Sequence, residues 1–185
     1  MRSRGEVDMG TVFLRRLSRW QAESEREGIG DLYAAAHRDA PGARPLERAE
    51  FVRRFTDHDI QQPDFDLVLA GDPGPVGCAW GFRADRGSRW WQSFLDVPAE
   101  IDELTQSRQV FVLAGVVVLP QRRRGQLGTR LHRELLSRSR APLSLALVEP
   151  GNAAALAALQ SWGWSKAGQL TPADGSPPLE TWARR

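Results

Sequence analysis

The sequence is poor in cysteine and contains no long apolar run. Cys78 is the single cysteine among 185 residues, which excludes a disulfide within the chain and fits a reducing compartment. No uninterrupted apolar stretch approaches the roughly 18 residues that a membrane-spanning helix needs. Near the N-terminus, apolar residues 11–14 are followed at once by Arg15 and Arg16, so the run is too short for a signal peptide. We therefore expect a cytoplasmic protein with no membrane partner.

A strong charge of either sign is also missing. Lysine and arginine together number 25 and aspartate and glutamate 23, which gives a formal net charge of +2. This small excess argues against a nucleic-acid partner, because proteins that bind nucleic acids carry strongly basic surfaces. With 41% hydrophobic and 26% charged residues, the composition is that of a globular protein. We expect one domain over residues 9–185 and a flexible tail at residues 1–8.

The central stretch, residues 110–136, reads VFVLAGVVVLPQRRRGQLGTRLHRELL. An apolar run of strand length ends at Pro120, and leucines spaced four apart at 127, 131 and 135 predict a helix after a basic turn. The start of a helix presents unpaired backbone N–H groups and the positive end of the helix dipole, so such a turn can bind a phosphate. The alternative is a capped helix with a solvated arginine cluster.

A second segment, residues 148–164, reads VEPGNAAALAALQSWGW. The two segments, in this order, resemble the GNAT superfamily of N-acetyltransferases. The first is similar to that family's acetyl-coenzyme A loop, Arg/Gln-x-x-Gly-x-Gly/Ala. The second is similar to its Asn-x-x-Ala-x-x-x-Tyr-x-x-x-Gly-Phe helix, with Asn152 at its first position.

The chain departs from the family pattern at two positions. Gln126 takes the place of the middle glycine of the loop, and Gly125 stands one residue early. We expect Gly125 to supply the flexibility that the family takes from the next residue. Leu159 stands where the family usually has a tyrosine that protonates the departing thiolate.

The resemblance implies acetyl-coenzyme A as cosubstrate, with its pyrophosphate on the turn and its pantetheine arm along the strand edge. The oxyanion would be stabilised by a backbone N–H of Val117 or a neighbour. Asn152 is also a candidate helix N-cap, and both roles can hold together. The residues implied for coenzyme binding are Val116, Val117, Val118, Arg123, Arg124, Gly125, Gln126, Leu127, Gly128, Thr129 and Asn152.

The implied fold is α/β (α+β), a single GNAT-like domain. Its mixed, mostly antiparallel central sheet would have six to seven strands and about four flanking helices. Apolar patterns and turn residues predict where these elements lie. The expected strands are 11–14, 65–70, 76–82, 110–119, 143–148, 164–170 and 179–183. The expected helices are 18–37 in broken form, 46–55, 127–136 and one starting at 152, with a further short helix in the 83–108 connection.

The sequence does not select a catalytic base. An alkylamine has a pKa near ~10.4 and arrives mostly protonated, so a group must accept its proton. The candidates are Glu149 at the exit of a strand, and Asp102 and Glu103 in the 83–108 connection, although each can be an ordinary surface charge. Cys78 alternates with glycine and alanine in an apolar strand and is expected to be a packed thiol. The spacing of His, Cys and carboxylates indicates no metal site.

The function that fits these features is an acetyl-CoA-dependent N-acetyltransferase. It would act on the amine of a small molecule by direct attack in a ternary complex. Acidic residues near Trp90 and Trp91 suit a cationic acceptor. Two alternatives stay open: a protein or peptide N-acetyltransferase, and a CoA-binding regulatory module without transferase activity, which Leu159 would suit. A homodimer also stays open.

Overall fold

The structure is a computed structural model that describes residues 11–39, 45–87 and 89–185. The expected flexible tail at residues 1–8 lies outside this part of the chain. The strands are β1 (Phe13–Leu17), β2 (Asp66–Asp72), β3 (Gly74–Arg83), β4 (Phe94–Leu95), β5 (Val110–Val118), β6 (Leu143–Val148), β7 (Ser165–Pro172) and β8 (Leu179–Arg184). The α-helices are α1 (Arg19–Ser24), α2 (Arg26–His37), α3 (Arg48–Arg54), α4 (Arg89–Gln92), α5 (Ala99–Gln106), α6 (Leu127–Ser137) and α7 (Ala153–Ser161). A π-helical turn, Phe55–Asp59, follows α3, and a 3-10 helix, Pro120–Gly125, precedes α6.

The strands form one sheet in the order β1-β2-β3-β5-β6-β8-β7-β4. Within the described residues, β5 and β6 are the parallel pair and the other neighbours are antiparallel, which confirms the mixed, mostly antiparallel α/β class. The sheet has eight strands, more than the expected six to seven, because the two residues of β4 pair with β7. A pair of residues is too short to show the alternation that predicts a strand.

The helices are also more numerous than expected. The broken helix expected over 18–37 is two helices, since Ser18 and Gln21 form a capping box at the start of α1 and the chain breaks at Glu25. The connection at 83–108 holds both α4 and α5. No helix within the described ranges is long and apolar enough to cross a membrane.

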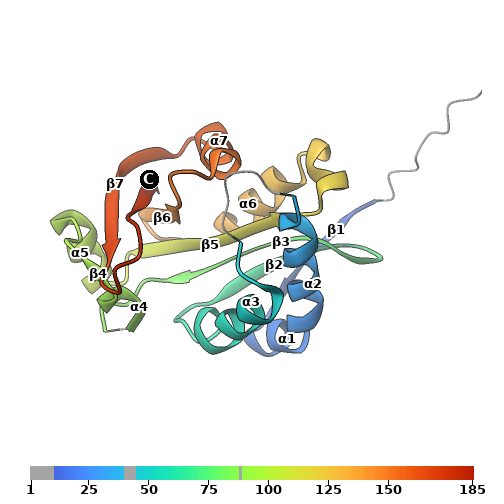
Figure 1. The fold of residues 1–185 in the computed structure, drawn as a ribbon, viewed down its shortest axis with the longest axis horizontal. Coiled ribbons are helices and arrows are strands. Elements are labelled where there is room, and N and C mark those ends of the chain that lie inside the picture. The colour runs from blue at the N-terminus through green and yellow to red at the C-terminus, as the bar shows by residue number, and fades with distance from the viewer. Residues whose placement is uncertain (1–10, 40–44, 88) are drawn as a thin grey trace, which may run out of the picture.

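Helices cover both faces of the sheet (Figure 1). Helices α6 and α7 lie on one face, and α1, α2 and α3 on the other, with α4 and α5 at the far end. Leu127, Leu131 and Leu135 of α6 are at most 3% exposed, so the predicted stripe is the buried face of this helix. Burying each of these side chains contributes about 1.5–3 kcal/mol to folding.

Strand β5 changes its neighbours midway along its length. On one edge it pairs with β3, where Trp80 opposes Gly115 and Gly81 opposes Leu113, so Ala114 is an extra residue in a β-bulge. On the other edge it pairs with β6 only over residues 110–112. Both strands continue beyond that point. The edge of residues 113–118 that faces away from β3 therefore has no strand partner among the described residues, and we call it the open edge.

Gly115 lies against the indole of Trp80, and a Cβ at this position would overlap the six-membered ring. The ring cannot easily move aside, because Trp80 is 3% exposed and its Nε1 donates to Asp59 Oδ2 at 2.8 Å. We predict that Gly115→Ala lowers the free energy of unfolding by about 1–3 kcal/mol through overpacking. Urea unfolding followed by circular dichroism measures this loss.

Gly125→Ala is the matched control. A Cβ at Gly125 meets no atom within 4 Å, and the residue has no positive φ, so its effect should stay within about 0.5 kcal/mol. Equal losses in the two variants would contradict the role assigned to the Trp80–Gly115 contact.

Candidate active site

The open edge presents backbone groups in a fixed alternation. The N–H of Leu119 donates to the carbonyl of Val76 at 3.0 Å, so Leu119 faces β3. In a regular antiparallel ladder successive residues face opposite edges. The N–H and C=O of Val118 and Val116 therefore face the open edge, whereas those of Val117 face β3. An extended, amide-containing chain could bond Val116 and Val118 as an added strand would.

The turn after β5, residues 120–129, ends at an uncapped helix N-terminus. Gln126 is the N-cap residue of α6, with a left-handed φ of 56° and no side-chain bond to the helix. The backbone N–H groups of Leu127, Gly128 and Thr129 belong to the first turn, where no carbonyl of the helix itself can accept from them. Together with the helix dipole, they form a corner suited to an anion.

The structure corrects the expectation about Gly125. This residue has no positive φ, and Gln126 takes the left-handed conformation that the family pattern gives to a glycine. A side chain in this region costs roughly 1–2 kcal/mol. The left-handed residue therefore stands at the position of the family's middle glycine, although that residue here is Gln126.

Trp162 forms one wall of this corner. Its Nε1 donates to Thr129 Oγ1 at 3.0 Å, and its ring lies 3.6 Å from where a Cβ of Gly128 would be. Sequence analysis did not single out Trp162, although it directly precedes the Gly163-Trp164 pair of the second motif. The indole fixes the first turn of α6 against the end of α7.

The guanidinium of Arg123 is already engaged within the protein. It donates to the carbonyl of Ala36, at the end of α2, at 2.5 Å and to the carbonyl of Val118 at 3.3 Å. Arg123 therefore fastens the turn to α2 and to the strand. These two bonds use two of the five N–H donors of the guanidinium group and leave the others for a ligand. The side chain of Arg124 lies outside what the structure describes.

Asn152 is the N-cap of α7, because its side chain accepts from the N–H of Ala155 at 3.2 Å. Its carboxamide NH2 group has no acceptor among the described residues. Leu159, on the same helix, is 4% exposed and packs in the core with the leucines of α6. The position at which the family has a tyrosine therefore holds a packed side chain with no proton to give.

Glu149 directly follows β6 and lies near Tyr33 of α2. Burial is the largest cause of the raised pKa of Tyr33, and the negative charges of Glu149 and Glu50 add to it. The Tyr33 hydroxyl accepts from the N–H of Leu46 at 3.0 Å, and its ring stacks on Phe51 at 3.9 Å. Glu149 thus lies within electrostatic range of Tyr33, directly after β6, the strand that runs parallel to β5.

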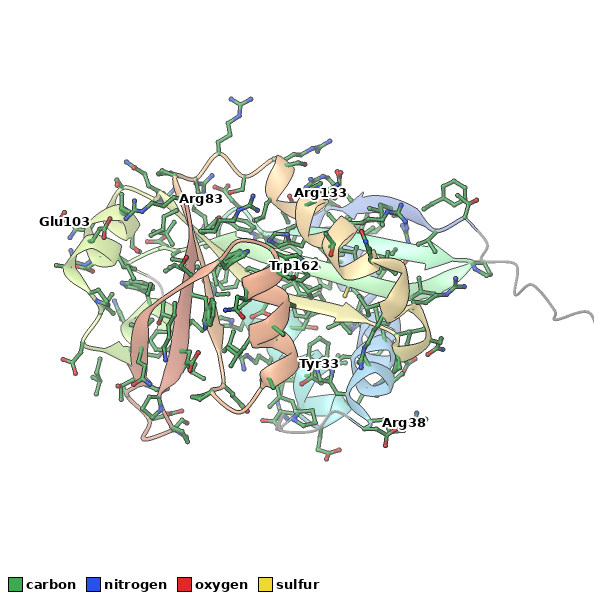
Figure 2. The ribbon with its side chains drawn as sticks, turned by 90° about the horizontal axis from the view of Figure 1, so that it is seen from above. Tyr33, Arg38, Arg83, Glu103, Arg133 and Trp162 are labelled. Atoms are coloured by element: carbon green, nitrogen blue, oxygen red, sulfur yellow. The ribbon has the colours of Figure 1, made fainter. Side chains whose placement is uncertain are left out.

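The other two candidate acids lie elsewhere. Asp102 pairs with Arg86 at 3.1 Å, and Glu103 is exposed on α5. Figure 2 shows Glu103 at one end of the molecule and Tyr33 nearer its middle. Because α5 packs near the start of β5, at Val110 and Val112, neither acid is placed at the open edge.

The remaining candidate nucleophile is buried. Cys78 is 1% exposed, and burial raises the pKa of its thiol to about 12, so it stays protonated and inert at neutral pH. Within the described part of the chain, no three His, Cys, Asp or Glu residues gather in a way that could hold a metal ion.

The model of the acetyltransferase (GNAT) family matches residues 26–164, which is most of the chain and spans both motifs. The chain belongs to the GNAT family of acetyltransferases. No curated protein matches its sequence.

Solved structures of GNAT acetyltransferases share the fold. An acetyltransferase from Thermus thermophilus has a TM-score of 0.64 and 13% identity, covering 94% of this chain and 96% of its own. Aminoglycoside acetyltransferase AAC(6')-Ib in complex with coenzyme A has a TM-score of 0.62 and 20% identity, covering 94% of both chains. YncA of Salmonella typhimurium, solved with acetyl-CoA, has a TM-score of 0.59 and 16% identity, covering 95% of this chain and 94% of its own.

One histidine of this GNAT protein is held neutral beside the corner. His132 of α6 is 3% exposed, stacks on Trp162 at 4.3 Å, and its Nε2 accepts from Trp164 Nε1 at 3.0 Å. Burial, then the charges of Arg184 and Arg133, lower the pKa of His132 from 6.5 to about 4. Protonation of Nε2 would also set two donors face to face.

We predict that His132 makes the protein less stable in mild acid. Below pH 6.5 the unfolded chain takes up a proton that the fold excludes, so the contribution is complete above pH 6.5 and is lost as pH falls to about 4. The loss should be about 2 kcal/mol in the free energy of unfolding. Chemical denaturation between pH 7 and pH 4 measures it.

His132→Gln is the control, because the glutamine keeps an acceptor for Trp164 and does not titrate. The difference between wild type and variant should shrink as the pH falls, since only the wild type loses this contribution. A difference that does not change with pH would show that His132 does not titrate in this range.

Proposed function

We propose that this GNAT protein is an acetyl-CoA-dependent N-acetyltransferase that acetylates the amine of a small molecule by direct attack in a ternary complex. The observation that carries the proposal is the meeting of the open edge of β5 with the uncapped N-terminus of α6. One presents strand-type hydrogen-bonding groups and the other an anion corner. Coenzyme A has both partners, a pantetheine arm with two amides and a pyrophosphate.

In this proposal, backbone groups do most of the binding. The N–H groups of Leu127, Gly128 and Thr129 hold the pyrophosphate, and Val116 and Val118 pair with the pantetheine amides. The NH2 of Asn152 donates to the same arm from the β6 side. Arg123 acts by holding the turn in place, through its bonds to Ala36 and Val118.

The transfer begins when the unprotonated amine attacks the thioester carbonyl carbon, and the carbonyl oxygen becomes an oxyanion. The N–H of Val116 or Val118 that the pantetheine arm does not use stabilises this charge, so the role expected for Val117 or a neighbour goes to one of these neighbours. Collapse of the intermediate breaks the carbon–sulfur bond and releases the thiolate. Thiols have pKa values near ~8.5, so the thiolate can leave without a protein acid at the position of Leu159.

Glu149 is our candidate for the group that takes the amine proton, directly or through a water. It lies at the end of β6 within electrostatic range of Tyr33, whose ring stacks on Phe51, and a carboxylate near aromatic rings also suits a cationic amine. Because Asp102 and Glu103 lie beside the start of β5, we do not assign them a part in the reaction.

A small amine is our preferred acceptor, and a peptide is the alternative. The fold is shared with aminoglycoside acetyltransferase AAC(6')-Ib, solved with coenzyme A and kanamycin, and with a ribosomal-protein-S18-alanine N-acetyltransferase from Escherichia coli. The fold therefore serves both classes. Our preference rests on the carboxylate of Glu149 near the Tyr33 ring, which suits a small cationic amine. We also propose that the protein is cytoplasmic and has no nucleic-acid partner. Whether it forms a homodimer stays open.

We predict that Gly128→Asp strongly weakens acetyl-CoA binding. A Cβ at Gly128 makes ordinary contacts with Trp162 and Val118, at 3.6 and 3.8 Å, so the fold accepts it. The added carboxylate would stand where the pyrophosphate binds and should weaken affinity by about a hundredfold. Isothermal titration calorimetry with acetyl-CoA measures the change.

Gly128→Ala supplies the Cβ without the charge and should bind within about threefold of wild type. If the wild type binds no acetyl-CoA, this protein has no working coenzyme site and the proposed function is wrong. If Gly128→Asp binds as well as wild type, the pyrophosphate lies elsewhere.

We predict that Glu149→Gln lowers kcat for a good amine acceptor by about a hundredfold and leaves acetyl-CoA affinity unchanged, because only proton removal is lost. Thiol release in the presence of a panel of small amines measures the rate. Glu103→Gln, an exposed acid on α5, is the control and should leave kcat unchanged. A normal kcat for Glu149→Gln would assign proton removal to another group or to solvent.

A further inference from the structure

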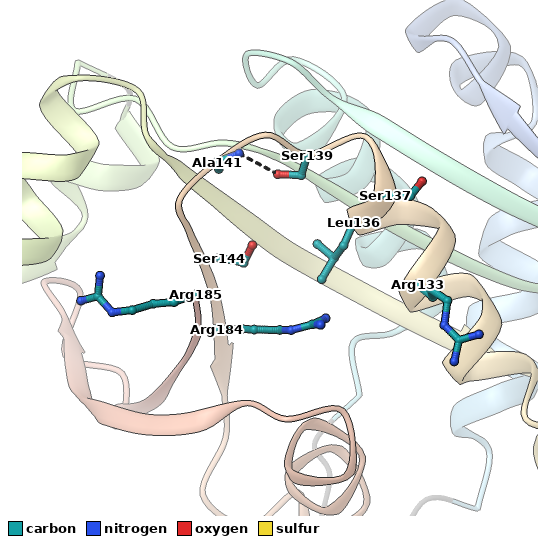
Figure 3. A pocket seen from close by; sticks show the side chains of 8 residues that line it. All are labelled: Arg133, Leu136, Ser137, Ser139, Ala141, Ser144, Arg184 and Arg185. Carbon is teal, nitrogen blue, oxygen red and sulfur yellow. Dashed lines mark hydrogen bonds between the residues drawn. The ribbon is translucent and has the colours of Figure 1, made fainter.

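A depression of about 300 Å³ lies beside the C-terminal half of α6, where the ends of β6 and β8 pass beneath it (Figure 3). Six of the residues that line it are Arg133, Leu136, Ser137, Ser139, Ser144 and Arg184. We call this depression the arginine pocket. The rise of an α-helix places its α6 residues about 9–15 Å along the helix from the anion corner at Leu127.

The positive charges of the arginine pocket are not balanced by carboxylates. Arg133 and Arg184 form no ion pair with any acid in the part of the chain that the structure describes. Arg185, which also lines the pocket, pairs with Glu100. Arg133 of α6 and Arg184 of β8 line the pocket from two different elements, and the charges of both lower the pKa of His132.

Ser144 also lines this pocket. The residue is 8% exposed, and its hydroxyl bonds no other group within the described ranges. Ser144 lies directly opposite Arg184 in the β6–β8 ladder, so the two side chains leave the sheet on the same face. Because the pocket opens to solvent, this hydroxyl is available to bond a ligand that enters it.

We propose that the arginine pocket binds the phosphate group of a small ligand. Two guanidinium groups and a hydroxyl provide donors that suit the oxygens of a phosphate, and Arg is the residue best matched to this geometry. Leu136 and Ala141 give an apolar wall for a small organic body. The ligand is inorganic phosphate or a phosphomonoester. The site is separate from the proposed coenzyme site and does not depend on the proposed function.

The test is calorimetric titration of the full chain with inorganic phosphate and, separately, with glycerol 3-phosphate, at constant ionic strength set with chloride. We expect saturable binding that weakens by about tenfold in Arg133→Gln and in Arg184→Gln, because each loses a charge-assisted contact. Ser144→Ala should weaken it by about threefold. Near-ultraviolet circular dichroism checks that each variant is folded.

Two control variants locate the site. Arg138→Gln removes the same charge from an exposed arginine at the end of α6 that does not line the pocket, and it should bind as wild type. Gly128→Asp blocks the anion corner at the other end of α6 and should also leave phosphate binding intact. Tighter binding of glycerol 3-phosphate than of phosphate would identify a phosphomonoester, and equal binding would identify free phosphate.

Three results would overturn the proposal. The first is no saturable binding of either probe. The second is an equal loss of phosphate affinity in Arg138→Gln, which would show that the affinity depends on the net charge of the protein and not on the arginine pocket. The third is a loss in Gly128→Asp alone, which would move phosphate to the anion corner.

Discussion

The contact between the indole of Trp80 and Gly115 is the constraint on which the site depends. The indole is held by Asp59 and lies against the strand where a side chain would otherwise be. The neighbouring residue, Ala114, is the bulge, and a bulge bends a strand and increases its twist. Pairing between β5 and β6 ends just before it, at Val112. The bend therefore accounts for the open edge, which a straight β5 would have closed with β6.

The anion corner depends on a second long-range contact. Arg123 bonds the last turn of α2, so a side chain that the motif assigns to the ligand is used to hold the turn. The strain of a left-handed Gln126 is offset by the burial of Leu127, Leu131 and Leu135 directly after it. The corner can thus act through its backbone, whose N–H groups point outward whatever side chains surround them. This explains how the turn tolerates departures from the family pattern.

The sequence was sufficient for the features that repeat with a regular period. The four-residue spacing of leucines predicted α6, and Asn152 was correctly expected to cap α7. The bulge could not be predicted, because every residue around Ala114 is apolar or glycine. An extra residue reverses the alternation of polar and apolar side chains, and this run has no such alternation to reverse. The partner of Arg123 lies 87 residues away and the two residues of β4 show no period, so neither leaves a local signal. The prediction for Gly125 was wrong, because the left-handed conformation occurs at the residue that precedes the first turn of α6, and this residue is Gln126.

Because Leu159 replaces the family's tyrosine, removal of the amine proton becomes the critical step of the proposed reaction. In the core under α7 it contributes packing where the family pattern has a hydroxyl, so the thiolate would leave unprotonated. Once the nitrogen has lost its proton, it could be expelled only as an amide anion, which is a far poorer leaving group than a thiolate whose thiol has a pKa near ~8.5, so the intermediate then loses sulfur. Until then, the protonated amine is the group more readily expelled. Removal of the amine proton therefore decides whether the intermediate goes forward, and a carboxylate at the end of β6 would matter more to this protein than the missing acid.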